Sequence, residues 1–190
     1  MAALNAIELE ILDKIADLLH SSFFDMVMPK ISALGDAGWI WILFAVLFLI
    51  RKQDRKTGLT MILALIFSLI TANMLLKPFV ARARPFQINT AVDLLIAAPR
   101  DYSFPSGHTQ SSFAAASAMY FNKRKAGTAA LLLASLIGLS RLYLYLHFLS
   151  DVIAGAAIGY MLGGLADNLI GGIRWRYISK RRKRRGAAPG

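Results

Sequence analysis

The sequence predicts an all-α integral-membrane protein: a helical bundle of five to six transmembrane helices with an amphipathic N-terminal helix. Hydrophobic residues make up 56% of the 190 residues, and the mean hydropathy of +0.51 is too high for a soluble globule of this size. Several apolar stretches approach the roughly 20 residues that a spanning helix needs. Lys and Arg cluster beside these stretches, as expected of loops that flank membrane spans.

Residues 1–30 are predicted to form an amphipathic segment at the membrane interface. Apolar side chains recur at helical spacing from Leu4 to Met26, and charged ones such as Glu10 and Lys14 fall on the other side. A helical cap packed on the bundle explains the same pattern, so both interpretations stay open. No cleaved signal peptide is expected, because a basic stretch followed by an apolar one and a cleavage site is missing.

Residues 31–173 are predicted to form the transmembrane domain. The expected spans are 31–50, 57–76, 106–121, 126–146 and 148–173. Trp39 and Trp41 are placed at interfacial depth in the first span. The second span is expected to run to Leu76 and stop at Lys77-Pro78, because proline disfavours helical backbone for the residue before it.

Two segments lie outside these spans. The connection 77–104 is the longest, and its middle, residues 91–98, is predicted to be a short interfacial helix. Residues 174–190 form a basic cytoplasmic tail, which we expect to be disordered over its charged part.

The positive-inside rule predicts the topology of the bundle. Lys and Arg accumulate at 51–56, 123–125 and 174–185, which are alternate loops of a five-span bundle, so all three are expected in the cytoplasm. The connection 77–104 and the turn at 146–148 then face outward. We therefore expect a multi-pass plasma-membrane protein with a cytoplasmic C-terminus. The net charge of +11 does not indicate nucleic-acid binding, because the cations are divided among these membrane-flanking loops.

Three short clusters place ionisable groups in this apolar chain, where such groups usually mark a functional site. His147 and Asp151 are four residues apart and share a face if both are helical. Asp151 can then accept a hydrogen bond from one imidazole nitrogen and leave the other as a nucleophile. The alternative is a structural hydrogen bond.

A second cluster, Pro105-Ser106-Gly107-His108, opens a predicted helix. Ser106 is a favoured N-cap, and backbone N–H groups at such a helix start bind anions. Gly107 allows a phosphoryl oxygen to approach the backbone closely. His108 is placed to donate a proton to a leaving oxygen. The alternative is an ordinary capped helix start.

Lys77, Arg84 and Arg141 are the candidate phosphate clamp, because their donors would offset charge on phosphoryl oxygens. The alternative is that these cations snorkel at helix ends, which is the interpretation kept for Arg82 and Arg100. Asp93 and Asp101 are assigned to turns and solvent, and a glycine stripe at Gly155, Gly159 and Gly163 to helix packing. No metal site or cofactor is expected: the chain has no cysteine, and no group of His and carboxylates offers enough ligands.

The clusters read K-x6-R-P from Lys77 to Pro85, P-S-G-H from Pro105 to His108, and S-R-x5-H-x3-D from Ser140 to Asp151. Over roughly residues 57–165 the chain resembles the type 2 phosphatidic-acid phosphatase superfamily. The resemblance implies a phosphohistidine at His147 that Asp151 orients, and a general acid, later base, at His108. It also implies that Lys77, Arg84, Ser106, Gly107 and Arg141 hold the phosphoryl group without a metal.

The implied substrate is a membrane lipid phosphate or diphosphate, and the resemblance favours undecaprenyl diphosphate. Phosphatidylglycerophosphate and phosphatidate are the alternatives within the same chemistry. A non-catalytic lipid-phosphate binder or transporter is the alternative from another class. The expected partners are therefore the lipid substrate and the bilayer, without nucleic acid, and no motif specifies an oligomeric state.

Overall fold

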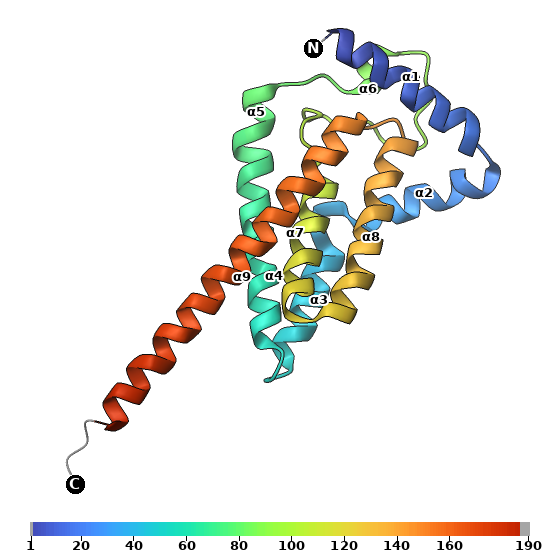
Figure 1. Ribbon diagram of the computed structural model, residues 1–190. Coiled ribbons are helices and arrows are strands. Elements are labelled where there is room, and N and C mark those ends of the chain that lie inside the picture. Colours follow the sequence, from blue (N-terminus) through green and yellow to red (C-terminus); the bar gives the residue numbers. More distant parts are fainter. Residues whose placement is uncertain (1, 187–190) are drawn as a thin grey trace.

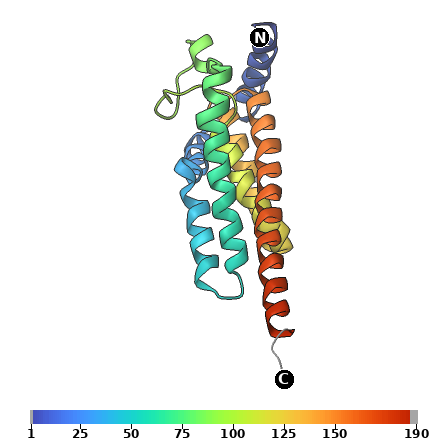
Figure 2. The same cartoon turned by 90° about the vertical axis from the view of Figure 1, so that its left-hand side faces the viewer.

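The computed structural model describes residues 2–186, and it describes the backbone alone for Ala2 and for residues 173–186. Every regular element in this part of the chain is a helix. The long helices run side by side and α1 lies across one end of them, as Figures 1 and 2 show. The all-helical prediction is confirmed.

The N-terminal segment forms two helices, α1 (Ala2–Leu19) and α2 (Ser22–Leu34), where the sequence predicted one. The chain breaks at Ser21, whose hydroxyl oxygen accepts a hydrogen bond from the Phe24 N–H at 3.3 Å and caps α2. One face of α1 packs on the bundle through buried Leu12. Leu4, Ile7 and Leu18 remain exposed on α1. The helix is thus a packed cap that also keeps an apolar outer face.

The first predicted span is bent. α2 meets the 3₁₀ turn η1 (Asp36–Gly38) and α3 (Trp39–Ile50) at 46°. Trp41 is fully buried and donates its indole N–H to Ser112 Oγ at 2.9 Å, so it faces the interior of the bundle, and its depth in the membrane stays a prediction. Trp39 remains half exposed. The hydroxyl on α7 explains the difference, because it satisfies the indole donor inside the bundle.

The second span does not end before Pro78. α4 (Arg55–Leu69) continues through a π-helical stretch, η2 (Ile70–Leu76), into α5 (Lys77–Val80). The wider π turn changes the hydrogen-bond ladder just where proline lacks its N–H, so helical backbone persists at Lys77.

The long connection contains one short helix, α6 (Pro85–Ile88), and residues 91–98 are not helical. The prediction of an interfacial helix at 91–98 is therefore wrong. Pro85 is favourable at a first helical position, and Gln87 Oε1 accepts a hydrogen bond from the Arg84 N–H at 2.8 Å. These local features start the helix earlier than the hydrophobic pattern indicated.

Helices α7 (Gly107–Asn122) and α9 (Leu149–Gly186) pack closely along the glycine stripe. A Cβ added at Gly155 would lie 2.9 Å from the Ser106 carbonyl oxygen, and at Gly159 and Gly163 it would meet α7 even more closely. The packing interpretation of the stripe is confirmed. The Ser106 N–H also donates to the Asp151 carbonyl at 3.1 Å, which joins the N-terminal ends of the two helices.

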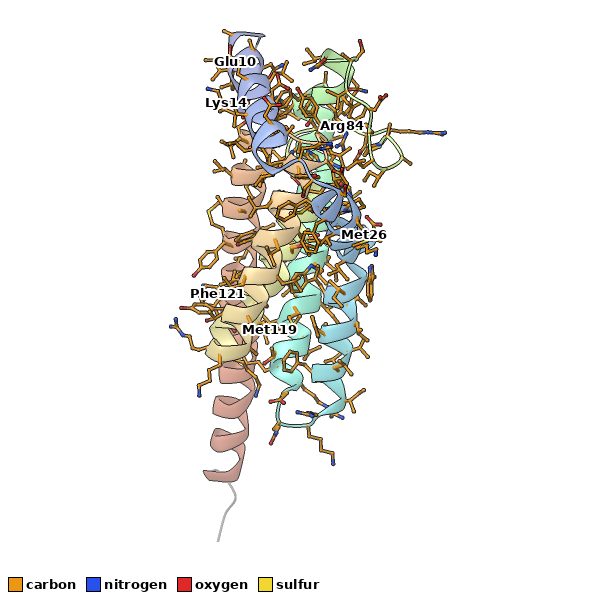
Figure 3. The ribbon with its side chains drawn as sticks, turned by 90° about the vertical axis from the view of Figure 1, so that its right-hand side faces the viewer. Glu10, Lys14, Met26, Arg84, Met119 and Phe121 are labelled. Atoms are coloured by element: carbon orange, nitrogen blue, oxygen red, sulfur yellow. The ribbon has the colours of Figure 1, made fainter. Side chains whose placement is uncertain are left out.

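The basic loops gather at the opposite end of the bundle. Lys123, between α7 and α8 (Arg124–Tyr143), forms an ion pair with Asp54 at 2.5 Å. Lys56 pairs with Asp167 of α9 at 2.7 Å. Figure 3 shows Arg84 near the upper end of the bundle, with Met119 and Phe121 far below it.

Three helical segments within the described residues are long and apolar enough to cross a membrane: Arg55–Ile88, Arg124–Tyr143 and Leu149–Gly172. The bent pair of α2 with η1 and α3 makes a fourth if it counts as one span. At 16 residues, α7 is shorter than the roughly 20 residues that a spanning helix needs. A total of five or six remains a prediction. Beyond the apolar part, α9 continues as helix to Gly186, contrary to the disorder expected there, and residues 187–190 of the tail lie outside the described residues.

Candidate active site

One end of the bundle collects the three clusters predicted from sequence. The N-terminal ends of α7 and α9, the C-terminal end of α8 and the end of η2 meet beneath α1 and the connection 81–106 (Figure 1). The buried side chains there include Lys77, Arg84, Ser106, Arg141, His147 and Asp151. The segments are far apart in the sequence, and the glycine contacts of α9 with α7 bring two of them together.

His147 lies in the turn between α8 and α9 and not on a helix, which corrects the sequence-based assumption of a shared helical face. The turn contains Tyr145 in the left-handed region, at φ 58°. A non-glycine residue held there is strained and needs support from its surroundings. That support comes from α1 and from the end of α6, because the Tyr145 hydroxyl donates to Asp13 Oδ1 at 2.8 Å and accepts from the Asn89 amide at 3.2 Å.

The imidazole of His147 is 1% exposed, and its Nε2 lies 3.1 Å from Arg84 Nη1. A guanidinium has only donors, so Nε2 must accept this hydrogen bond and carries a lone pair. Burial lowers the pKa of His147 well below its usual value, and the charges of Arg84, Arg141, Lys77 and His108 lower it further. The imidazole is therefore neutral at neutral pH, with its lone pair at Nε2.

The other nitrogen, Nδ1, faces Asp151 without a direct hydrogen bond. The distance from Nδ1 to Asp151 Oδ2 is 3.7 Å, longer than a hydrogen bond. Ser103 lies beside both groups, with its Oγ 3.4 Å from Nδ1 and donating to Asp151 Oδ2 at 2.5 Å. Asp151 Oδ2 also accepts the Phe148 N–H at 3.0 Å. Asp151 thus fixes the turn through the Phe148 N–H, and its carboxylate interacts with the imidazole through charge and not through a hydrogen bond.

Asp151 has a strong partner in Arg82, for which the sequence favoured a snorkelling cation outside the site. Arg82 is 5% exposed, not snorkelling, and donates from Nη1 to Asp151 Oδ1 at 2.6 Å. Its Nη2 donates to Glu8 Oε2 of α1 at 2.6 Å. The guanidinium also lies 3.9 Å from the centroid of the Phe148 ring, a cation–π contact.

His108, in the first turn of α7, contacts a carboxylate of its own. Its Nε2 is 2.7 Å from Asp36 Oδ1 at the start of η1. Two cavities border this imidazole. One of about 370 Å³ includes Lys77, Asp101 and Gly107 in its lining, and the other, of about 390 Å³, includes Asp36 and Arg141.

Lys77 and Arg84 both bind Asp101, which the sequence analysis assigned to solvent. Arg84 Nη2 donates to Asp101 Oδ1 at 2.6 Å, and Lys77 pairs with Oδ2. Burial raises the pKa of Asp101, but the hydrogen bonds and charges of Lys77 and Arg84 outweigh it and lower this pKa to about 2. The Asp101 carboxylate is therefore ionised at neutral pH, and it binds both Lys77 and Arg84.

Arg141 reaches the site from α8. Its Nη1 donates to Ser32 Oγ of α2 at 2.5 Å, whereas its buried Nε has no protein partner. Buried donors are almost always paired, so an oxygen of a ligand in the adjoining cavity would satisfy this one.

Ser106 and Gly107 place the backbone at the start of α7 beside the site. Ser106 stands at the N-cap of α7 but makes no side-chain cap, because its Oγ accepts a hydrogen bond from the Thr109 hydroxyl at 2.9 Å. A Cβ added at Gly107 would lie 3.6 Å from Lys77 Nζ, so the glycine keeps the backbone open toward that cation.

A sequence model of the PAP2 superfamily matches residues 57–175, well over half of the chain. The chain belongs to the PAP2 superfamily. It is 31% identical to Undecaprenyl-diphosphatase BcrC of Bacillus subtilis over 77% of this chain and 75% of that protein. It is also 31% identical to Undecaprenyl-diphosphatase of Sulfolobus acidocaldarius over 67% of this chain and 62% of that protein, so it spans less than two thirds of this relative.

Among solved structures, the transmembrane PAP2 type phosphatidylglycerolphosphate phosphatase from Bacillus subtilis has a TM-score of 0.75. The identity is 24%, and the match covers 91% of this chain and 89% of that one. This likeness supports the fold. The apolar spans and this fold together indicate that the PAP2 chain is a multi-pass membrane protein. The names of the relatives support a lipid-phosphate hydrolase.

Within residues 3–172 of this PAP2 chain, no group of three or more His, Cys, Asp or Glu side chains is arranged to hold a metal ion. The carboxylates near the site are instead bound to arginine, lysine or histidine.

Sequence reasoning missed several charged residues of this region, among them Arg82, Glu8 and Asp101. Arg82 has the same sequence surroundings as a snorkelling cation, two residues from Arg84. Glu8 lies on a helix whose charged side looked solvent-exposed. Only the fold reveals that each has a buried or cationic partner.

Proposed function

We propose that the protein is a metal-independent membrane lipid phosphatase that works through a phosphohistidine at His147. The observation that carries the proposal is the accepting Nε2 of a neutral, buried imidazole at 3.1 Å from Arg84, with a carboxylate behind its other nitrogen. An uncharged imidazole surrounded by cations suits attack on an anionic phosphoryl group.

In the proposed first step, His147 Nε2 forms a bond to phosphorus while the bond from phosphorus to the leaving oxygen breaks. His108 donates a proton to that oxygen. Lys77, Arg84 and Arg141 offset the charge on the phosphoryl oxygens, and the backbone at Ser106 and Gly107 lies beside them.

In the second step, His108, now unprotonated, takes a proton from water. The oxygen of this water attacks phosphorus, the bond between nitrogen and phosphorus breaks, and inorganic phosphate leaves. The positively charged phosphoimidazole between the two steps faces Asp151, whose carboxylate stabilises it.

The proposed substrate is undecaprenyl diphosphate, with phosphatidylglycerophosphate or phosphatidate as alternatives. Two relatives named undecaprenyl-diphosphatases support this choice. The site is proposed to open on the extracytoplasmic side, because the basic loops around Lys56 and Lys123 gather at the other end of the bundle.

Initial rates on the three lipids in detergent micelles test the substrate. We expect the highest kcat/KM on undecaprenyl diphosphate. A preference for phosphatidylglycerophosphate or phosphatidate would reassign the substrate within the same chemistry. Binding of the lipids without phosphate release would instead support the non-catalytic binder.

The absence of a metal requirement gives a second expected result. Because the proposed phosphate ligands are Lys77, Arg84 and Arg141, the rate of phosphate release should be unchanged after dialysis against excess EDTA. Rates are measured before and after dialysis, with added Mg²⁺ or Zn²⁺ as the control. A rate that falls with EDTA and recovers with one of these ions contradicts the mechanism.

Asp101 should compete with the phosphoryl group for Lys77 and Arg84. Asp101→Asn removes the competing charge, and we expect inorganic phosphate to inhibit the variant about three to ten times more tightly, since a larger fraction of sites is open. The inhibition constant is measured at constant pH, with Asp93→Asn, an exposed loop carboxylate, as the control. Weaker inhibition would mean that Asp101 orders the clamp and does not compete with phosphate.

A further inference from the structure

A buried chain of charges connects α1 to the helix that carries Asp151. Glu8 Oε2 accepts from Arg82 Nη2 at 2.6 Å, and Arg82 Nη1 donates to Asp151 Oδ1 at 2.6 Å. Glu8 is 4% exposed and Asp151 is fully buried. Burying charged groups carries a large desolvation cost, so this row of three buried charges indicates a role for them.

Glu8 also holds the start of α9 directly. Its Oε1 accepts the Ser150 N–H at 2.6 Å, and its Oε2 accepts the Ser150 hydroxyl at 3.0 Å. Arg82 fills the space between, with further hydrogen bonds to Asn5 Oδ1. The carboxylate from α1 is therefore fixed relative to the turn that contains His147.

The charges of Glu8, Arg82 and Asp151 do not cancel. Two carboxylates share one guanidinium, so a single negative charge remains, and Asp151 presents it toward Nδ1 of His147 at 3.7 Å. If Glu8 were neutral, Arg82 would cancel the charge of Asp151. The imidazole would then face a neutral pair at the moment when it becomes a cationic phosphoimidazole.

We infer that Glu8, acting through Arg82, is a positioning residue that keeps Asp151 in place and leaves it a net negative charge toward His147. The inference rests on the proposed phosphohistidine mechanism. It gives α1 a function beyond capping the bundle, because a helix outside the matched family region completes the electrostatics of the site.

The test replaces Glu8 by Gln, which keeps the shape and an accepting oxygen but removes the charge. For Glu8→Gln we expect kcat on a lipid phosphate to fall about tenfold, one pKa unit's worth of stabilisation, with KM within about twofold. Glu8→Asp, which retains the charge, should recover much of kcat. Glu10→Gln, exposed on the same helix, is the matched control (Figure 3).

The pH profile separates this role from a structural one. The groups that face His147 are Arg84, Arg141, Lys77 and His108, with Asp151 and Arg82 behind it. Removing the negative charge of Glu8 disfavours the imidazolium, so the acid limb of kcat against pH should move to lower pH. Arg82→Gln removes a positive charge and should move that limb to higher pH.

Opposite displacements of the acid limb support the inference. An unmoved limb in both variants, or a loss of kcat that only follows the fraction of folded protein on gel filtration, overturns it. If Glu8→Gln does not fold, Arg82→Gln alone decides by the direction of its displacement. A wild-type protein that releases no phosphate, or forms no phosphohistidine, would instead refute the proposed function.

Discussion

His147→Ala is expected to abolish lipid-phosphate hydrolysis, with kcat lower by about four orders of magnitude or more, as when other covalent enzymes lose their nucleophile. No other described side chain places an accepting imidazole nitrogen against Arg84, so no nucleophile is at hand to replace it. The removed ring leaves a small polar space in a buried turn. The helices should therefore remain packed through the glycine stripe.

Two measurements accompany the loss of activity. Rapid quenching with radiolabelled substrate should trap an acid-labile, base-stable phosphoprotein from the wild type and none from the variant. His20→Ala is the control, because His20 is exposed just after α1 and contacts Asp25 of α2. Normal turnover by a folded His147→Ala protein would falsify the mechanism.

The pH dependence of folding stability should also reflect the environment of His147. The pKa of His147 is lowered by burial and by the neighbouring cations, so the free enzyme keeps a neutral nucleophile as pH falls through 6.5. The unfolded chain takes up a proton there and the folded one does not. Folding stability from this group therefore decreases as the pH falls below 6.5.

The sequence was enough to predict that the motif residues meet at one end of the bundle, because this follows from the topology of the spans alone. Alternate basic loops place the remaining connections on one side, and the motif residues lie in those connections or at their edges. The glycine spacing in α9 then indicated a close helix contact, and the structure places that contact against α7. Neither inference needed a side-chain conformation.

Interactions between distant residues could not be predicted in the same way. Trp41 is drawn inward by the hydroxyl of Ser112, which is 71 residues away, and no local pattern indicates that bond. Arg82 and Glu8 are 74 residues apart and each has a plausible exposed alternative. The direct hydrogen bond from His147 to Asp151 was expected from helical spacing, and it is missing because His147 precedes the helix.

His108→Asn should lower kcat on an alkyl lipid phosphate by about 10²- to 10⁴-fold, the usual contribution of a general acid or base. An alkoxide leaves poorly without a proton. An aryl phosphate whose phenol is far more acidic needs no such help, so its first step should be slowed much less. The second step still needs a base for water with either substrate.

The variant is therefore expected to release a burst of one phenol per active site and then almost stop, because the phosphohistidine accumulates. Stopped-flow absorbance at the phenolate band measures the burst. Ser135→Ala is the control, because Ser135 is exposed on α8 and donates to the Leu131 carbonyl of its own helix. Equal losses on alkyl and aryl substrates, without a burst, would mean that His108 only binds the phosphoryl group. A burst followed by slow turnover assigns it both proton transfers, since one missing imidazole then accounts for the alkyl defect and for the trapped intermediate.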